Sequence, residues 1–262
     1  MRPPGEHDRP PTASPLDEQV DETAPMADAA EDSRALRRAR RRAGWLSAAL
    51  LSVAAVLTVS LLIDPVQPWF QPFDDWWFEL VASHRSGLLT SIAEVLDVVG
   101  SVVVTVPVRL VALTVLLVRR RWMQTLAFAV ALVASELCIG PLKAVVDRAR
   151  PPVRIVETTS ASFPSGHAVA AAVTAFGLVI AFLPRGRRRV HWVIGAALIA
   201  GCMAWSRTYL GAHWATDTLA GVCIGVGLAV GVDALLESLR TEVAEAVVDP
   251  PGPDRSPLPM DR

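Results

Sequence analysis

The sequence predicts an all-α membrane protein, a polytopic bundle of six transmembrane helices. Of its 262 residues, 52% are hydrophobic, and the mean hydropathy is +0.39. Both values are high for a water-soluble domain of this length. Uncharged apolar runs such as residues 45–63 and 168–184 approach or reach the length that crosses a bilayer. Basic residues form short clusters between alternate apolar segments, as in multi-pass proteins.

The chain divides into three parts. Residues 1–43 are rich in Pro, Ala, Asp and Glu without apolar periodicity, and we expect a disordered cytoplasmic tail there. This stretch is too polar for a secretory signal peptide, so the first span is expected to act as an uncleaved signal anchor. Residues 44–239 are predicted to be the transmembrane domain, and residues 240–262 a second disordered cytoplasmic tail.

Six apolar segments make up the transmembrane domain. We place them at residues 44–63, 95–118, 122–142, 166–184, 189–205 and 213–236. Basic clusters precede the first segment, separate the second from the third, and separate the fourth from the fifth. Because cytoplasmic loops carry the excess of Lys and Arg, both termini of this cell-membrane protein are predicted to be cytoplasmic. The loops that then face outward are residues 64–94, 143–165 and 206–212.

The first outer loop is rich in aromatic residues, namely Trp69, Phe70, Phe73, Trp76, Trp77 and Phe78. We expect an amphipathic segment that lies in the membrane interface, with these rings at the level of the lipid headgroups. An anchoring belt of aromatic residues is favoured over a role in reading the substrate. Asp74 or Asp75 could cap a short helix that begins there.

The charged residue Arg109 lies within the second apolar segment, and Glu136 lies within the third. Charges in lipid are costly, and they usually pair or serve function. Glu136 precedes Lys143 by two helical turns and could support it, although Pro141 between them weakens that geometry. An ion pair between Arg109 and Glu136 is the alternative, and the sequence leaves both open.

The stretch from Ser206 to Asp217 joins the fifth apolar segment to the sixth. If a helix begins near Gly211, His213 and Asp217 stand at i and i+4 on one face, so the carboxylate can hold one imidazole nitrogen. The other nitrogen then faces outward, and such a histidine is a ready nucleophile or base. Arg207 could hold an anion against it. A polar pair at the end of a membrane helix is the structural alternative.

The third segment ends in a second set of cations. Lys143 is the single lysine among 25 basic residues, which favours a role for a compact point charge. Lys143 and Arg150 are seven residues apart, so on a helix both project to one side before Pro151 and Pro152 end it.

The fourth segment begins with Ser165, Gly166 and His167. Ser165 is a natural N-cap, and Gly166 lets another group approach the backbone closely. The free N–H groups of this first turn, together with the helix dipole, make an anion site with His167 at its rim.

The predicted topology brings these three segments to the same outer face. Three cationic side chains and a helix N-terminus around two histidines suit the spread charge of a phosphoryl group in transfer. No second carboxylate completes a Mg²⁺ site, and the three cysteines are too dispersed for a Zn²⁺ site or a disulfide framework. We therefore expect neither a metal nor a cofactor.

The order and spacing of the motifs resemble the three signature blocks of the type 2 phosphatidic acid phosphatase (PAP2) family, whose active site is similar to that of vanadium haloperoxidases. The matching blocks are Lys143-x6-Arg150-Pro151, Pro164-Ser165-Gly166-His167, and Ser206-Arg207-x5-His213-x3-Asp217. In hydropathy the likeness extends from about residue 73 to the end of the sixth segment. The resemblance implies a PAP2/haloperoxidase-like helical core.

The resemblance also implies roles for the site residues. The residue that attacks phosphorus and forms a phosphohistidine would be His213, with Asp217 orienting and activating it. The departing oxygen would be protonated by His167. The phosphate oxygens would be held by Lys143, Arg150, Ser165, Gly166 and Arg207, and no metal would be required.

The expected function is that of a metal-independent membrane lipid phosphatase with its active site on the extracytoplasmic face. Its partners would be the bilayer and a lipid phosphate, such as phosphatidic acid, phosphatidylglycerol phosphate or undecaprenyl or another polyprenyl diphosphate, and no nucleic acid. A phosphotransferase that uses the same phosphohistidine is one alternative. A non-catalytic headgroup binder or transporter is another, but it would not need His167, His213 and Asp217 together.

Overall fold

The structure is a computed structural model that describes residues 23–248, without the side chains of residues 23–32, 187 and 245–248. The described residues form eight helices and no strand, so the all-α prediction is confirmed for them. The helices are α1 (Thr23–Ile63), α2 (Gln71–Ser83), α3 (Gly87–Gly100), α4 (Val102–Val118), α5 (Trp122–Val146), α6 (Gly166–Phe182), α7 (Arg187–Tyr209) and α8 (Ala215–Val248).

The chain forms two units, residues 1–40 and residues 41–262, and α1 contributes to both. Residues 23–43 were expected to be part of a disordered tail, but here they are helical, as are residues 240–248 at the end of α8. Ala and Arg are strong helix formers, so the composition of residues 23–43 favours a helix despite its charge. The rest of the two predicted tails, residues 1–22 and 249–262, lies outside the described residues.

Within residues 23–248, four helical segments are long and apolar enough to cross a membrane: Ser33–Ile63, Trp122–Val146, Arg188–Tyr209 and Ala215–Ala244. A fifth candidate is the pair α3 and α4, which is bent by 48°. α6 is apolar but has only 17 residues. The predicted apolar segments fall on these helices, and the chain is a multi-pass membrane protein. Among the described residues, four helices, or five spans with the bent pair, meet these criteria, whereas the sequence predicted six.

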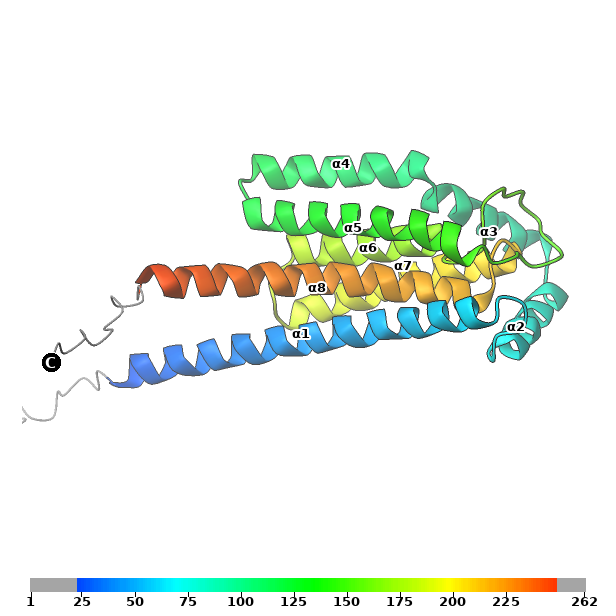
Figure 1. The fold of residues 1–262 in the computed structure, drawn as a ribbon. Helices are drawn as coiled ribbons and strands as arrows, with labels where there is room; N and C mark the ends of the chain where they lie inside the picture. Colours follow the sequence, from blue (N-terminus) through cyan, green and yellow to red (C-terminus); the bar gives the residue numbers. More distant parts are fainter. Residues whose placement is uncertain (1–22, 249–262) are drawn as a thin grey trace, which may run out of the picture. The chain divides into compact units, whose positions relative to one another are not determined.

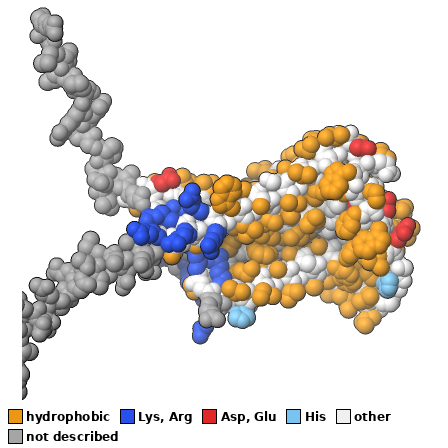
Figure 2. Space-filling view, turned by 90° about the horizontal axis from the view of Figure 1, so that it is seen from below, with side chains coloured by type: hydrophobic (Ala, Val, Ile, Leu, Met, Phe, Trp, Pro, Cys, Tyr) orange, Lys and Arg blue, Asp and Glu red, His pale blue; other side chains and the backbone are white. Residues whose placement is uncertain are grey.

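The helices expose large hydrophobic side chains along their length. Examples are Val103, Leu137 and Leu198, which are 75%, 70% and 63% exposed. Hydrophobic side chains cover most of the face drawn in Figure 2. An apolar surface of this extent is unusual in water but is expected where helices meet acyl chains.

The packing of α6 against α8 positions the site. Gly221 and Gly225 of α8 face Ala168 and Ala172 of α6, and a Cβ on Gly225 would lie 2.7 Å from the Cβ of Ala172. Small residues at such positions let two membrane helices approach closely. The first turn of α6 therefore lies directly beside the first turn of α8, where the backbone N–H of Ser165 donates to the carbonyl of Asp217 at 3.1 Å.

An ion pair joins Arg109 of α4 to Glu136 of α5, with Nη1 and Oε1 separated by 3.0 Å. Arg109 also donates through Nε to Thr174 Oγ1 of α6 at 2.9 Å. Of the two alternatives left open by the sequence, the structure has the ion pair. The charge of Arg109, whose side chain is 9% exposed, is thereby compensated by a carboxylate whose side chain is 60% exposed.

Candidate active site

The predicted site residues converge at one end of the unit formed by residues 41–262. The C-terminal ends of α5 and α7, the N-terminal ends of α6 and α8, and the loop at 147–165 all meet there (Figure 1). Tight packing of α6 on α8 and the return of this loop onto both helices bring together residues that are up to 74 positions apart. The convergence of the three motif blocks is thus built into the topology.

His213 lies in the loop before α8. The sequence predicted a helix start near Gly211, but α8 begins at Ala215, so only Asp217 of the pair is in the first turn. Gly211 has φ +68°, and a Cβ there would lie 2.3 Å from the carbonyl oxygen of Val153. The left-handed backbone and this close approach explain why a turn, rather than the helix, occupies this position.

The orientation of the His213 ring is set by a backbone carbonyl. Its Nδ1 lies 2.6 Å from the oxygen of Ser162, so Nδ1 carries the proton and Nε2 keeps its lone pair. Nε2 lies 3.4 Å from Nη1 of Arg150. The ring is 4% exposed, and burial lowers the pKa of His213 to about 4 against the opposing influence of Asp217. The imidazole is therefore neutral at pH 7, with Nε2 facing a cation.

Asp217 does not hold the imidazole directly, as the sequence had suggested. Its Oδ2 is 3.8 Å from His213 Nδ1, beyond a hydrogen bond. Instead Oδ2 accepts from the Ser162 hydroxyl at 2.5 Å and from the Trp214 backbone N–H at 2.9 Å. Ser162 thus bridges the pair: its hydroxyl contacts the carboxylate while its carbonyl holds the histidine. Sequence reasoning missed this residue, because a backbone contact leaves no motif.

Arg148 supports Asp217 from the opposite side. It donates through Nη1 to Asp217 Oδ1 at 2.6 Å and through Nη2 to Asp74 Oδ2 at 2.7 Å. All three side chains are at most 2% exposed. Asp74 also accepts from the backbone N–H of Thr216 at 2.9 Å, and burial raises its pKa. Neither Arg148 nor Asp74 was predicted as a site residue. In the sequence, the only features that pointed to them were the charged pair Asp147 and Arg148 close to Arg150, and the acid Asp74 in the aromatic loop.

Lys143 and Arg150 come together through the loop and not along a helix face. α5 ends at Val146, and Asp147 turns the chain with φ 41°, so Arg150 lies outside the helix that was predicted to carry it. Both side chains reach one carbonyl: Lys143 Nζ donates to Ala161 O at 2.5 Å and Arg150 Nη2 at 3.3 Å. Burial lowers the pKa of Arg150. Their shared acceptor places the two cations beside each other, and Arg150 of this pair reaches His213.

Arg207 and His167 share a carboxylate that the sequence did not single out. Asp97 of α3 contacts Arg207 Nη1 through Oδ1, and the same oxygen lies 3.2 Å from His167 Nε2. The backbone carbonyl of Asp97 is also 3.2 Å from His167 Nε2. Asp97 lies near the start of the second predicted apolar segment, residues 95–118, and no role in the site was predicted for it from the sequence. Its place in the site depends on how α3 packs against α6 and α7.

α6 begins at Gly166, directly after Ser165, as the sequence predicted. Ser165 is the N-cap residue, but its hydroxyl makes no capping hydrogen bond, and Oγ is buried without a partner in the described residues. A Cβ on Gly166 would meet no atom within 4 Å. The first-turn N–H groups and this hydroxyl can therefore receive an anion.

The residues 23–248 contain no group of three or more His, Cys, Asp or Glu that could hold a metal ion. The positive charge at the site comes from the side chains of Lys143, Arg150 and Arg207. Cationic side chains can stabilise a developing phosphoryl charge in the same way as metal ions do.

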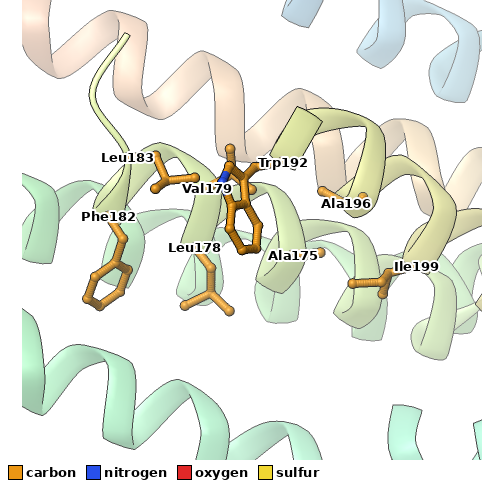
Figure 3. A pocket seen from close by; sticks show the side chains of 9 residues that line it. Ala175, Leu178, Val179, Phe182, Leu183, Trp192, Ala196 and Ile199 are labelled. Atoms are coloured by element: carbon orange, nitrogen blue, oxygen red, sulfur yellow. The ribbon is translucent and has the colours of Figure 1, made fainter. Parts of the chain in front are cut away.

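A hollow lies far from the site, between the C-terminal half of α6 and the N-terminal half of α7 (Figure 3). Its volume is about 490 Å³, and Leu178, Phe182, Trp192 and Ile199 are among its lining residues. Its walls are almost entirely apolar, so it suits hydrocarbon rather than phosphate.

Fold and site together define a class: an all-α, multi-pass membrane protein with a buried histidine facing a cluster of cations. Residues 124–237 match the PAP2 superfamily. This segment contains all three motif blocks, and the resemblance predicted from them is confirmed.

Named relatives agree with this match. The chain is 37% identical to phosphatidylglycerophosphatase B of Bacillus subtilis (strain 168) over 106 residues, which are 38% of this chain and 51% of the relative. It is 28% identical to the undecaprenyl-diphosphatase of Sulfolobus acidocaldarius over 158 residues, which are 56% of this chain and 71% of that protein. The chain thus spans about half the length of the Bacillus relative.

The fold is similar to the crystal structure of a transmembrane PAP2 type phosphatidylglycerolphosphate phosphatase from Bacillus subtilis. The TM-score is 0.63 and the identity 22%, and the match covers 74% of this chain and 96% of the other. At this identity the likeness bears on the fold alone.

Proposed function

We propose that this protein is a membrane lipid phosphatase that works through a phosphohistidine on His213. The observation that carries the proposal is the orientation of His213. Its Nδ1 donates to Ser162 O at 2.6 Å, so the lone pair of Nε2 points toward Arg150 and the cationic cluster. A neutral imidazole aimed at the place where an anion binds is an activated nucleophile.

In the first step, Nε2 of His213 attacks the phosphorus of the substrate. The bond from phosphorus to the lipid oxygen, or to the bridging oxygen of a diphosphate, breaks with its electron pair on oxygen. His167, at the rim of the same site, donates a proton to that oxygen. The imidazolium that forms at His213 keeps its Nδ1 proton on Ser162, and Asp217 compensates its charge from 3.8 Å.

In the second step, a water molecule attacks the phosphohistidine. His167 takes a proton from this water, the P–N bond breaks, and its electron pair returns to Nε2. Inorganic phosphate is released and both histidines regain their starting states. A separate nucleophile and general acid of this kind divide one difficult displacement into two easier ones.

The phosphate oxygens would be held by donors that now contact backbone carbonyls or have no partner. Lys143 and Arg150 donate to carbonyls of residues 160 and 161, and these bonds can be exchanged for charge-assisted bonds to phosphate. Ser165 Oγ and the N–H groups at Gly166 complete the cradle. Arg207 would supply the third cation. No metal is needed in this scheme.

The surroundings of the site favour a lipid substrate. Apolar helices surround it, and α2 beside it exposes Phe73 by 48% and Trp76 by 54%, as expected for an interfacial helix. The relatives are named for phosphatidylglycerol phosphate and undecaprenyl diphosphate, so these lipids and phosphatidic acid are the substrates to compare.

We further propose that the chain crosses the membrane six times with the site on the extracytoplasmic face. The bent pair α3–α4 and the short α6 would each count as one crossing. Arg119, Arg120 and Arg121 lie at the ends of α4 and α5 away from the site. The same holds for Arg185, between α6 and α7, and for Arg188 in the first turn of α7. The positive-inside rule then places those loops and both termini in the cytoplasm.

The test is phosphate release by the purified protein in detergent with EDTA present. Phosphatidylglycerol phosphate, phosphatidic acid and undecaprenyl diphosphate are compared, and acceptor alcohols are added to detect transfer. Release should be lost in His213→Ala and kept in His191→Ala, an exposed histidine on the far end of α7. No release from any lipid by folded protein, or full release by His213→Ala, would contradict the proposal.

A further inference from the structure

We propose that the carboxylate of Asp97 occupies part of the phosphate subsite in the free protein and leaves this position when the phosphate of the substrate binds. This inference rests on the proposed function, because the subsite is the one assigned there to the reacting phosphate. It adds a residue from α3, outside all three motif blocks, to the groups that control binding and release.

The geometry of Asp97 is that of a phosphate oxygen. A single carboxylate oxygen contacts the guanidinium of Arg207 and lies 3.2 Å from Nε2 of His167. In the proposed reaction, Arg207 holds a phosphate oxygen, and His167 donates a proton to the oxygen of the leaving group. Asp97 therefore contacts both groups in this conformation, at the position where the substrate must bring its own oxygens.

Carboxylate and phosphate cannot both keep this position. Two anions within about 4 Å repel strongly in a partly buried site, and one of them must move or be neutralised. Asp97 is the group that can move. Its side chain is 31% exposed, whereas that of Arg207 is 2% exposed, so the carboxylate has a path to water and the guanidinium does not.

Arg207 is also equipped to bind a larger anion than one carboxylate oxygen. Its Nη1 contacts Asp97, but Nε is buried and has no partner in the described residues. A buried donor without an acceptor is costly, and a tetrahedral oxyanion that reached Nε as well as Nη1 would satisfy both. Asp97 thus occupies only some of the N–H donors of the Arg207 guanidinium.

The consequence is that the site binds phosphate more weakly than its three cations would bind it in the absence of Asp97. Competition from Asp97 raises the dissociation constant of the product phosphate, and the returning carboxylate speeds its release. Between turnovers the same carboxylate keeps Arg207 and His167 in place. Removing its charge should therefore tighten the binding of phosphate, whereas a purely structural ion pair would weaken it when broken.

The experiment measures the binding of inorganic phosphate and of orthovanadate to the purified protein in detergent, by calorimetry at fixed pH and ionic strength. The variant is Asp97→Asn, which keeps the shape of the side chain. The matched control is Glu94→Gln, which removes one charge from an exposed position one turn earlier on α3. Asp97→Ser provides a second variant if the asparagine protein does not fold.

We expect the dissociation constants of both anions to fall by about tenfold in Asp97→Asn and to be unchanged in Glu94→Gln. In lipid turnover, KM and kcat of Asp97→Asn should both fall, because product leaves more slowly. Unchanged or weaker anion binding in folded Asp97 variants would overturn the inference while leaving the phosphatase proposal intact. If the wild-type protein bound neither anion, the phosphate site itself would be refuted, and this inference with it.

Discussion

The guanidinium of Arg148 connects two buried carboxylates, Asp74 on α2 and Asp217 on α8, at 2.7 and 2.6 Å. Phe70 and Trp214 cover it, with their ring centroids 5.5 and 5.4 Å from its Cζ. Through this contact the interfacial helix α2 is tied to the carboxylate that supports His213. A buried charge with two partners of opposite sign and two aromatic faces is stabilised only while all of them are present.

The replacement Arg148→Met should unfold the protein at a lower temperature and abolish phosphate release. It leaves Asp74 and Asp217 buried without a counter-charge, which costs about 3–5 kcal/mol. Thermal unfolding in detergent measures the loss. Arg154→Met, on an exposed part of the same loop, should change the free energy of unfolding by no more than about 0.5 kcal/mol. Equal unfolding temperatures for the two variants would show that Arg148 does not stabilise the carboxylates.

The hydroxyl of Ser162 should matter for rate more than for binding. Ser162→Ala keeps the carbonyl that orients His213 but removes the hydrogen bond to Asp217 Oδ2. The support of the imidazolium in the transition state weakens, so we expect kcat to fall about tenfold with little change in KM. Steady-state kinetics are compared with Thr159→Ala, an exposed neighbour. A wild-type kcat for Ser162→Ala would mean that Asp217 acts on the imidazole without this bridge.

The free energy of unfolding should decrease as the pH is lowered, within a pH window that is set by His213. Its pKa is about 4 in the folded protein and about 6.5 when unfolded, so between these values the unfolded state binds a proton that the folded state does not. The contribution of neutral His213 is fully present above pH 6.5 and is lost as the pH falls toward 4, by about 3 kcal/mol. Below pH 4 His213 is protonated in both states, and its own contribution to the pH dependence ends.

The check is the free energy of unfolding between pH 4 and pH 7 for the wild type and for His213→Gln. The wild type should lose more stability on acidification than the glutamine variant, which has no imidazole at this position. His191→Gln should keep the wild-type slope, because that histidine is exposed. Parallel curves for all three proteins would contradict the lowered pKa.

The sequence predicted well what depends on short-range patterns. Apolar runs predicted helices, and the three motif blocks predicted that Lys143, Arg150, Arg207 and the two histidines share a site. Helix ends were predicted less well. Lys143 and Arg150 were expected on one helix face, but α5 ends at Val146, four residues before Arg150. The contacts that bring them together come from the path of the loop, which residue spacing does not encode.

The site residues that were not predicted from the sequence come from other helices and loops, and they reach the site through tertiary contacts. Asp97, Asp74 and Ser162 reach it from α3, α2 and the loop at 147–165. None lies at a fixed spacing from the histidines, and Ser162 acts partly through its backbone. Such contacts depend on the angle at which helices pack, for example on the 48° bend between α3 and α4. The ion pair between Arg109 and Glu136 was predicted only in part, because the sequence offered it as one of two alternatives.

The most direct test of the account is to trap the covalent intermediate. Protein that is turning over a lipid phosphate labelled with ³²P at the phosphoryl group is quenched in alkali, where a phosphohistidine survives, and the label on the protein is counted. We predict label on the wild type and on His191→Ala, none on His213→Ala, and loss of the label in acid. Rapid release of labelled phosphate without any labelled protein, or label that persists in His213→Ala, would contradict the central claim that His213 is the nucleophile.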